Sequence, residues 1–286
     1  MTIQLAQQQT LVQLKMLYDE REAANITDWV MEHITGKKKT DRLMDKQQIL
    51  PAPQIVKLDS ILQELATYKP IQYVLGEAWF AGMKFYVNEH TLIPRPETEE
   101  LVDWIREESQ KILDAGYSIL DIGTGSGCIP IALKKKLPLL SVTSIDVSKD
   151  ALEVAQQNAN TLQADISFLN IDFLDESNWN QLPVVDIIVS NPPYIKQSEQ
   201  DSMAKNVLDF EPAIALFVPD EDALLFYRKI AVFGKKHLSK QGCIFLEINE
   251  TLGKDVVQLY ENAGYIVELK KDLQGKDRMV KVNLKI

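Results

Sequence analysis

From Tyr117 to the C-terminus, short apolar runs alternate with stretches whose apolar residues recur at helical spacing. Alternation of this kind predicts a mostly parallel sheet with helices on both faces. The last two runs are joined only by LQGKD, which is too short for a parallel crossover, so the last strand is expected to be antiparallel. The seven predicted strands span residues 117–123, 141–146, 166–172, 184–191, 242–248, 265–272 and 278–284.

The first 70 residues or so follow a helical pattern, with apolar residues at helical spacing in residues 11–36 and 52–68. Gly36–Asp41 (GKKKTD) is expected to be a loop between helices. The stretch EAWFAGMKFYV then predicts two short strands joined at Ala81-Gly82, a hairpin that links two domains. The predicted organisation is a helical domain over residues 1–75, a hairpin linker over 76–95 and the sheet domain over 96–286.

Charge and cysteine content restrict the class of protein. The net charge is −10, of which −1 falls in residues 1–80 and −9 in residues 81–286. A duplex-binding protein normally displays a basic face, so nucleic acid is not expected as a direct substrate. Cys128 and Cys243 match no metal-ligand or redox spacing, and no signal peptide or membrane span is recognisable. We therefore expect a cytoplasmic protein without membrane attachment or metal.

A glycine-rich loop, LDIGTGSGCIP, ends the first strand of the predicted sheet and opens the next helix. The helix N-terminus there favours a nucleotide-like ligand. A dinucleotide fingerprint would need glycine at position 128, where Cys128 stands. A G-x-G-x-G loop after an aspartate is instead typical of S-adenosylmethionine-binding sheets, because it lets the cofactor lie close to the backbone. The predicted cofactor contacts in this loop are Gly123, Thr124, Gly125, Ser126 and Gly127.

Carboxylates end the next two predicted strands, at the edge where doubly wound sheets bind ligands. Asp146 lies about 20 residues beyond the loop, from where a carboxylate reaches ribose hydroxyls. Asp172 is placed to accept from an adenine amino group, and Phe173 to pack on the ring. Together with the loop, these residues predict S-adenosylmethionine as cofactor and S-adenosylhomocysteine as product.

The fourth strand runs into VSNPPYI, which brings Asn-Pro-Pro-Tyr to the same edge. The prolines stiffen the backbone and remove two N–H donors, so the inward-facing groups are the Asn191 side-chain oxygen and the Pro192 carbonyl. Two fixed acceptors suit an –NH2 group on a planar π system, because binding both hydrogens aims the nitrogen lone pair at the methyl group. Tyr194 can stack on the planar face. The predicted chemistry is N-methylation of a planar amine or amide, with Asn191, Pro192 and Tyr194 catalytic and no general base.

NPPY after such a sheet resembles the amino-methyltransferases as a group, and the flanking segments narrow the choice. PIQYVLGEAWFAGMKFYVNEHTLIPRPETEELV, DIGTGSGCIPIAL, SNPPYI, VLDFEPAIAL and KDLQGKDRMV closely resemble, in this order, the peptide chain release factor N(5)-glutamine methyltransferases, the PrmC/HemK family. The resemblance runs from about Pro70 to the C-terminus. It implies a seven-stranded Rossmann-like S-adenosylmethionine-dependent methyltransferase sheet whose last strand is antiparallel. It also implies methyl transfer to the glutamine of the Gly-Gly-Gln loop of bacterial class-1 release factors, on which the helical domain docks.

The same resemblance assigns roles to individual residues. It implies that Gly123 to Gly127, Asp146, Phe173 and Asn191 contact the cofactor, and that the glutamine is held by Asn191, Pro192, Pro193 and Tyr194. A segment that lines the same pocket in the family is matched by Arg95, Pro96, Thr98 and Glu99, although Arg95 and Glu99 could instead form an ion pair at a helix start. The chain departs from the family pattern after Glu247-Ile248, where Asn249 and Leu252 replace a frequent Gly and Gln and the pocket wall is expected.

Three other functions fit the sequence less well. A nucleic-acid amino-methyltransferase, acting on adenine, cytosine or guanine, is the main alternative, but it needs a basic groove to hold a flipped base, and the N-terminal 80 residues have almost balanced charge. A nicotinamide-dependent oxidoreductase is disfavoured by Cys128. An inert module that only binds release factors is hard to reconcile with an intact NPPY, and it need not bind S-adenosylmethionine at all.

Overall fold

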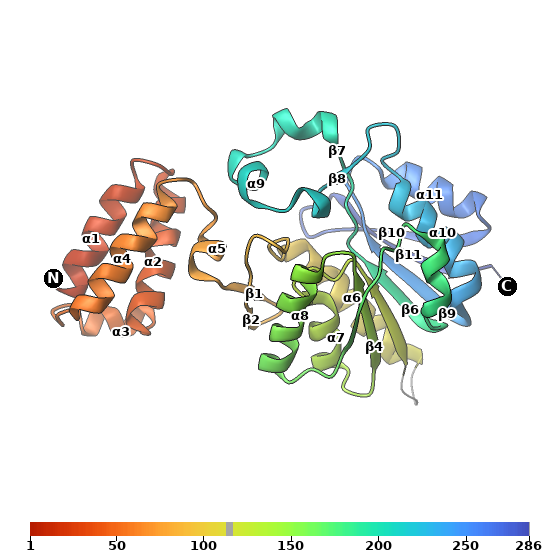
Figure 1. Cartoon of the computed structure of the whole chain (residues 1–286), viewed down its shortest axis with the longest axis horizontal. Helices are drawn as coiled ribbons and strands as arrows, with labels where there is room; N and C mark the ends of the chain where they lie inside the picture. Colours follow the sequence, from red (N-terminus) through yellow and green to blue (C-terminus); the bar gives the residue numbers. More distant parts are fainter. Residues whose placement is uncertain (113–116, 286) are drawn as a thin grey trace. The chain divides into compact units, whose positions relative to one another are not determined.

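The computed structural model describes residues 1–112 and 117–285, and by its internal contacts the chain divides into two compact units (Figure 1). One unit comprises Met1–Gly76 and Ala204–Phe210, and the other comprises Glu77–Met203 and Glu211–Ile286. Within the described part of the chain, no helix combines the length and the apolar character that a membrane crossing needs. Each unit has its own hydrophobic core.

The N-terminal unit is helical, and it contains α1 (Ile3–Leu14), α2 (Glu20–Thr35), α3 (Lys39–Met44), α4 (Ala52–Leu65), α5 (Ile71–Leu75) and α9 (Lys205–Phe210). The helical pattern over residues 11–36 belongs to two helices, and the second begins where the Asp19 side chain accepts from the Glu22 N–H and caps α2. The loop predicted over Gly36–Asp41 is wrong from Lys39 onward, where α3 begins. Arg42 in α3 is buried and paired with Asp28, a tertiary contact that local pattern does not reveal.

A β-hairpin of β1 (Ala78–Phe80) and β2 (Met83–Phe85) opens the second unit, with its turn at the predicted residues. Ala81 and Gly82 both have positive φ (50° and 76°), as a two-residue type I′ turn requires. Phe80 and Phe85 are fully buried in the same hydrophobic cluster as Leu101, Val102, Trp104 and Ile105 of α6 (Pro96–Ile112). The hairpin therefore packs as part of the sheet unit.

The main sheet has seven strands in the order β10-β11-β9-β6-β3-β4-β5. β11 is antiparallel to both of its neighbours, and every other adjacent pair is parallel, so the predicted topology is confirmed. The strands are β3 (Ser118–Ile122), β4 (Ser141–Asp146), β5 (Ser167–Asn170), β6 (Val185–Ser190), β9 (Leu238–Glu247), β10 (Tyr265–Lys271) and β11 (Asp277–Leu284). Because the strand order reverses beside β3, the crevice expected to bind a ligand lies at the carboxyl ends of β3, β4 and β6.

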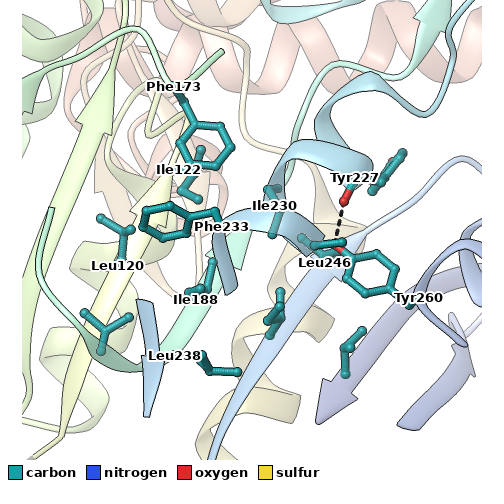
Figure 2. Packing of buried hydrophobic residues seen from close by; sticks show 14 of the residues in the cluster. Leu120, Ile122, Phe173, Ile188, Tyr227, Ile230, Phe233, Leu238, Leu246 and Tyr260 are labelled. Carbon is teal, nitrogen blue, oxygen red and sulfur yellow. Dashed lines mark hydrogen bonds between the residues drawn. The ribbon is translucent and has the colours of Figure 1, made fainter. Parts of the chain in front are cut away.

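Helices cover both faces of this sheet (Figure 1). One face packs against α6, α7 (Cys128–Lys136) and α8 (Lys149–Leu162), and the other against α10 (Leu225–His237) and α11 (Gly253–Asn262). Successive residues of the central strand alternate between the two cores: Ile119 lies in the first, and Leu120 and Ile122 lie in the second. Figure 2 shows the second core, where Tyr260 donates a hydrogen bond to the Tyr227 carbonyl (2.9 Å).

Several short elements are absent from the sequence-based expectation. The segment after Tyr194 forms β7 (Ile195–Lys196), which pairs parallel with β8 (Phe217–Val218) across more than 20 residues of chain. Strands of two residues carry no readable periodicity, so their pairing could not be predicted. The 3₁₀ helices are η1 (Glu176–Gln181), η2 (Gln197–Ser202) and η3 (Ala213–Ala215).

Candidate active site

The glycine-rich loop turns sharply between β3 and α7, and its three glycines all have positive φ. The Gly123 and Thr124 N–H groups donate to the Ile145 carbonyl (2.9 and 3.1 Å), which ties the loop to the end of β4. A Cβ placed on Gly123 or Gly125 would meet no atom within 4 Å, so this side of the backbone is open to a ligand. A Cβ on Gly127 would instead crowd Ile131 and Ala155, so Gly127 serves the packing of α7 on α8.

Asp146 ends β4 directly beside this loop. Its Oδ2 accepts from the Gly125 N–H and its Oδ1 from the Ser148 N–H, both at 2.9 Å. Burial raises the pKa of this carboxyl, and the two backbone hydrogen bonds oppose that effect. The structure thus holds a carboxylate rigidly at the position that the sequence assigned to a ribose-binding group.

Asp172 and Phe173 follow β5, the next strand along the sheet edge. Asp172 is exposed, and its Oδ1 accepts from the Leu174 N–H (2.9 Å). The Phe173 ring is stacked on Trp179, with ring centroids 5.5 Å apart. It also meets Phe233 edge-on, with centroids 5.3 Å apart, and Figure 2 shows these two rings. The core therefore fixes the orientation of the Phe173 ring before any ligand arrives.

One cavity at this edge of the sheet is lined by most of the predicted site residues. The predicted residues that line it are Gly123, Gly125, Asp146, Asp172, Phe173, Asn191 and Pro193. The predicted residues that do not line it are Thr124, Ser126, Gly127, Pro192 and Tyr194. Lining residues that sequence reasoning missed include His90, Leu92 and Phe226. The cavity combines the exposed glycine backbone of the loop, the fixed carboxylate of Asp146 and an apolar wall. This combination fits a nucleoside-like ligand such as S-adenosylmethionine.

The Asn191 side chain is anchored on its nitrogen side. Its Nδ2 donates to Oγ1 of Thr98 (3.2 Å), in the first turn of α6. Among the residues that the structure describes, no donor is bonded to the Asn191 Oδ1 or to the Pro192 carbonyl. Burial raises the pKa of the adjacent Tyr194 hydroxyl to about 12, so Tyr194 is neutral at physiological pH. At the end of β6, the Asn191 Oδ1 and the Pro192 carbonyl are thus both left as acceptors without a donor from the described residues.

Glu247 is a polar residue of this edge that sequence reasoning did not place in the site. It ends β9, it is 2% exposed, and its Oε2 accepts from the Thr98 hydroxyl at 2.6 Å. Burial raises its pKa to about 7, while the Thr98 hydrogen bond acts in the opposite direction. The sequence did contain a signal for Glu247, because a carboxylate ends the apolar run CIFLE. Since β9 is the parallel neighbour of β6, the end of this run lies at the same edge of the sheet as NPPY.

The segment at the start of α6 contributes differently from what the resemblance implies. None of Arg95, Pro96, Thr98 and Glu99 lines the cavity. Arg95 pairs with Glu211 (2.6 Å) rather than with Glu99, and the other Glu211 oxygen accepts from the Ile93 N–H (3.3 Å). This buried carboxylate therefore joins the motif LIPRPE to the motif DFEPAIAL. Thr98 contacts the site only indirectly, because its hydroxyl oxygen accepts from the Nδ2 of Asn191, which lines the cavity.

The two departures from the family pattern lie outside the cavity wall. The Asn249 Oδ1 accepts from the N–H and the hydroxyl of Thr251 (3.0 and 2.9 Å). The Leu252 N–H donates to the Asn249 carbonyl (2.9 Å), directly before α11 begins. Neither residue lines the cavity. Both therefore shape the turn that follows β9.

Known proteins match this chain along almost its full length. Two family models match it, the PrmC N-terminal domain over residues 6–76 and the methyltransferase small domain over residues 99–213. A release factor glutamine methyltransferase of Flavobacterium psychrophilum is 47% identical over 274 residues, 95% of either chain. The protein of the same name from Bacteroides thetaiotaomicron is 42% identical, over 94% of this chain and 96% of its own length. The one from Streptococcus pneumoniae is 40% identical, over 93% of this chain and 94% of its own length. The chain belongs to the family of release factor glutamine methyltransferases.

Proposed function

We propose that this protein transfers a methyl group from S-adenosylmethionine to the side-chain amide nitrogen of the glutamine in the Gly-Gly-Gln motif of class-1 peptide chain release factors. The names of its relatives support this substrate. The observation that carries the chemistry is a pair of acceptors to which no described residue donates: the Oδ1 of Asn191, a residue that lines the cavity, and the carbonyl of Pro192, the next residue in the chain. A primary amide supplies two N–H donors, so it matches both acceptors.

The acceptor pair orients the substrate nitrogen. An amide nitrogen is a poor nucleophile because its lone pair is delocalised, and hydrogen bonds to both of its protons favour the pyramidal geometry in which that lone pair is available. S-adenosylmethionine, when bound, would supply the methyl group: an S–CH3 bond would be exchanged for the N–CH3 bond, with S-adenosylhomocysteine as the leaving product and one amide proton passing to water. Pro192 and Pro193 keep the acceptors rigid, and Tyr194 stacks on the planar amide.

The remaining site residues hold the cofactor. Asp146, Asp172 and Phe173 line the cavity, where Asp146 would accept from the ribose hydroxyls and Asp172 and Phe173 would bind the adenine. Gly123 and Gly125 let the cofactor approach the backbone. Thr124, Ser126 and Gly127 do not line the cavity, so we assign them the role of shaping the loop and not of contacting the cofactor. The helical domain over residues 1–75 docks on the release factor, and the reaction takes place in the cytoplasm.

The test is incubation of the purified protein with labelled S-adenosylmethionine and a class-1 release factor, followed by peptide mass spectrometry. A release factor in which the loop Gln is replaced by Ala is the control. A single methyl group on that Gln, absent from the control, is the expected result. No incorporation by protein that binds the cofactor would refute the proposal and direct the search to nucleic-acid amines.

A further inference from the structure

Three side chains from three elements form a continuous hydrogen-bonded chain beside the cavity. The Asn191 Nδ2, at the end of β6, donates to the Thr98 hydroxyl, and that hydroxyl donates to the Glu247 carboxyl at the end of β9. Thr98 and Glu247 are each 2% exposed, so water does not compete for these bonds. We call this chain the Asn191–Thr98–Glu247 relay.

The relay has a direction that follows from the protonation state of Glu247. An ionised carboxyl only accepts hydrogen bonds, so the single proton of the Thr98 hydroxyl is directed to Glu247. The Thr98 oxygen is then left as an acceptor toward Asn191, and it selects the NH2 end of the Asn191 amide. The oxygen end is the one that remains for another partner.

Such selection is needed because an asparagine amide is nearly symmetric in size. Rotation by half a turn exchanges Oδ1 and Nδ2 with little steric consequence, yet it replaces an acceptor by a donor. A donor in that position would face the N–H groups of a substrate amide and repel them. Catalysis therefore requires one of two orientations that differ little in shape.

We propose that Thr98 and Glu247 are positioning residues for methyl transfer, which fix the Asn191 amide with its oxygen toward the substrate nitrogen. The proposal rests on the proposed function, because it assumes an –NH2 substrate. It also gives a reason for the burial of a carboxylate at this position. Burying a charge costs stability, and Thr98 is the only side chain bonded to the Glu247 carboxyl in the part of the chain that the structure describes. A role in positioning Asn191 would explain why this cost is tolerated.

Methyl transfer is expected to depend on pH through Glu247. When Glu247 is protonated, its own O–H can donate to Thr98, and the Thr98 proton is free to point at Asn191 and select Oδ1. The acceptor is then turned away from the substrate, so turnover falls on acidification through the pKa of Glu247, about 7. Several charged or titratable groups interact electrostatically with Glu247. They are Arg95, which directly precedes α6, Glu97 of α6, Cys128 of α7, Tyr194, Tyr227 of α10 and Arg278 of β11.

The experiment compares Thr98→Val with Thr98→Ser, because valine keeps the shape and serine keeps the hydroxyl. Thr98→Val is expected to lower kcat by about 10- to 100-fold, the effect of losing one well-placed hydrogen bond, with the S-adenosylmethionine Kd unchanged within about threefold. Thr98→Ser is expected to stay within about threefold of the wild type. Ser118→Ala is the matched control, since Ser118 donates to the Asp186 carboxyl (2.9 Å) at the opposite end of the sheet.

Glu247→Gln tests the direction of the relay by a pH profile of kcat. Glutamine does not titrate and can both accept and donate, so this variant is expected to be slower at pH 8 and to lose the acidic limb of the wild type. This comparison decides the question if Thr98→Val fails to fold.

The outcomes separate the two proposals. Wild-type kcat in Thr98→Val, equal losses in the valine and serine variants, or an acidic limb retained in Glu247→Gln would each overturn the relay while the glutamine substrate stands. A wild-type protein that binds S-adenosylmethionine and does not methylate the release factor refutes the proposed function, and the relay falls with it.

Discussion

Asn191 is the residue on which methyl transfer should depend most, because in the proposed mechanism the hydrogen bond from the substrate nitrogen to its Oδ1 strengthens as that nitrogen becomes pyramidal. We expect Asn191→Ala to lower kcat by about 10²- to 10³-fold, the range found when one positioned group of this kind is removed. Cofactor binding should change little, since the loop and Asp146 are untouched. Stopped assays at saturating S-adenosylmethionine together with calorimetry measure the two quantities.

The matched control for Asn191→Ala is Asn249→Ala. Asn249 lies at the same edge of the sheet, but its side chain is bonded to Thr251 and does not line the cavity. Its kcat should stay within about twofold of the wild type. Near-normal turnover in Asn191→Ala would show that the acceptor pair is not what activates the substrate.

Asp146 should act on affinity and not on turnover. It accepts from two backbone N–H groups of the loop and adjoining turn, and its position matches that of a ribose-binding carboxylate. Asp146→Ala is expected to raise the S-adenosylmethionine Kd by at least about tenfold, or 1.4 kcal/mol, as measured by calorimetry. Asp146→Asn retains one acceptor oxygen and should lie between the two. An unchanged Kd in the alanine variant would remove Asp146 from the ribose role.

At the scale of elements, the loop between β3 and α7 depends on Gly127 for packing. An alanine there adopts a positive φ of 78° and brings its Cβ to 3.1–3.3 Å from Ile131 and Ala155. Gly275 has a similar φ of 83° with open space around its Cβ, so Gly275→Ala carries the backbone cost alone, about 1–2 kcal/mol. Gly127→Ala should lose about 1–3 kcal/mol more, from overpacking. Urea unfolding of both variants measures the difference, and equal losses would contradict the packing role.

The sequence predicted those elements whose signal is local. Strands such as β6 are buried on both faces and appear as apolar runs, and the glycine loop and NPPY follow their strands directly. The break before α2 also had a local signal, an aspartate followed three residues later by a glutamate. By contrast, the Arg95–Glu211 pair and the Thr98–Glu247 hydrogen bond join residues more than 100 positions apart. No periodicity encodes such pairs, so these contacts emerged only from the folded chain.

At the scale of the molecule, the candidate site belongs to one unit. All residues assigned here to cofactor and substrate lie in Glu77–Met203 or Glu211–Ile286, and they stand on the two cores of the sheet. The N-terminal unit has a separate core that includes Val30, Met31 and Leu65. If the proposed site is correct, we expect the sheet unit to carry cofactor binding, and the proposed docking role falls to the helical unit.

Stability of the whole protein should depend on pH through buried carboxyls of the sheet unit. Asp121 is fully buried beside the glycine loop, and burial raises its pKa to about 7 from 3.8. Between pH 4 and pH 7 the folded chain therefore keeps a proton that the unfolded chain has released, so the free energy of unfolding falls as pH rises through this window. Below that window both states are protonated, and above it both are ionised and the full cost is present.

Asp121→Asn removes this titration and should reveal it by difference. Its free energy of unfolding relative to the wild type is expected to rise by about 1–3 kcal/mol between pH 5 and pH 8, measured by urea unfolding. Asp186→Asn is the control, because serine and backbone hydrogen bonds keep the pKa of Asp186 below 3.8, so that it is ionised in both states throughout this range. Its difference from the wild type should stay flat. A flat difference for Asp121→Asn as well would mean that the buried carboxyl is ionised in the folded protein at pH 5, where the Ser144 hydroxyl donates to it (3.2 Å).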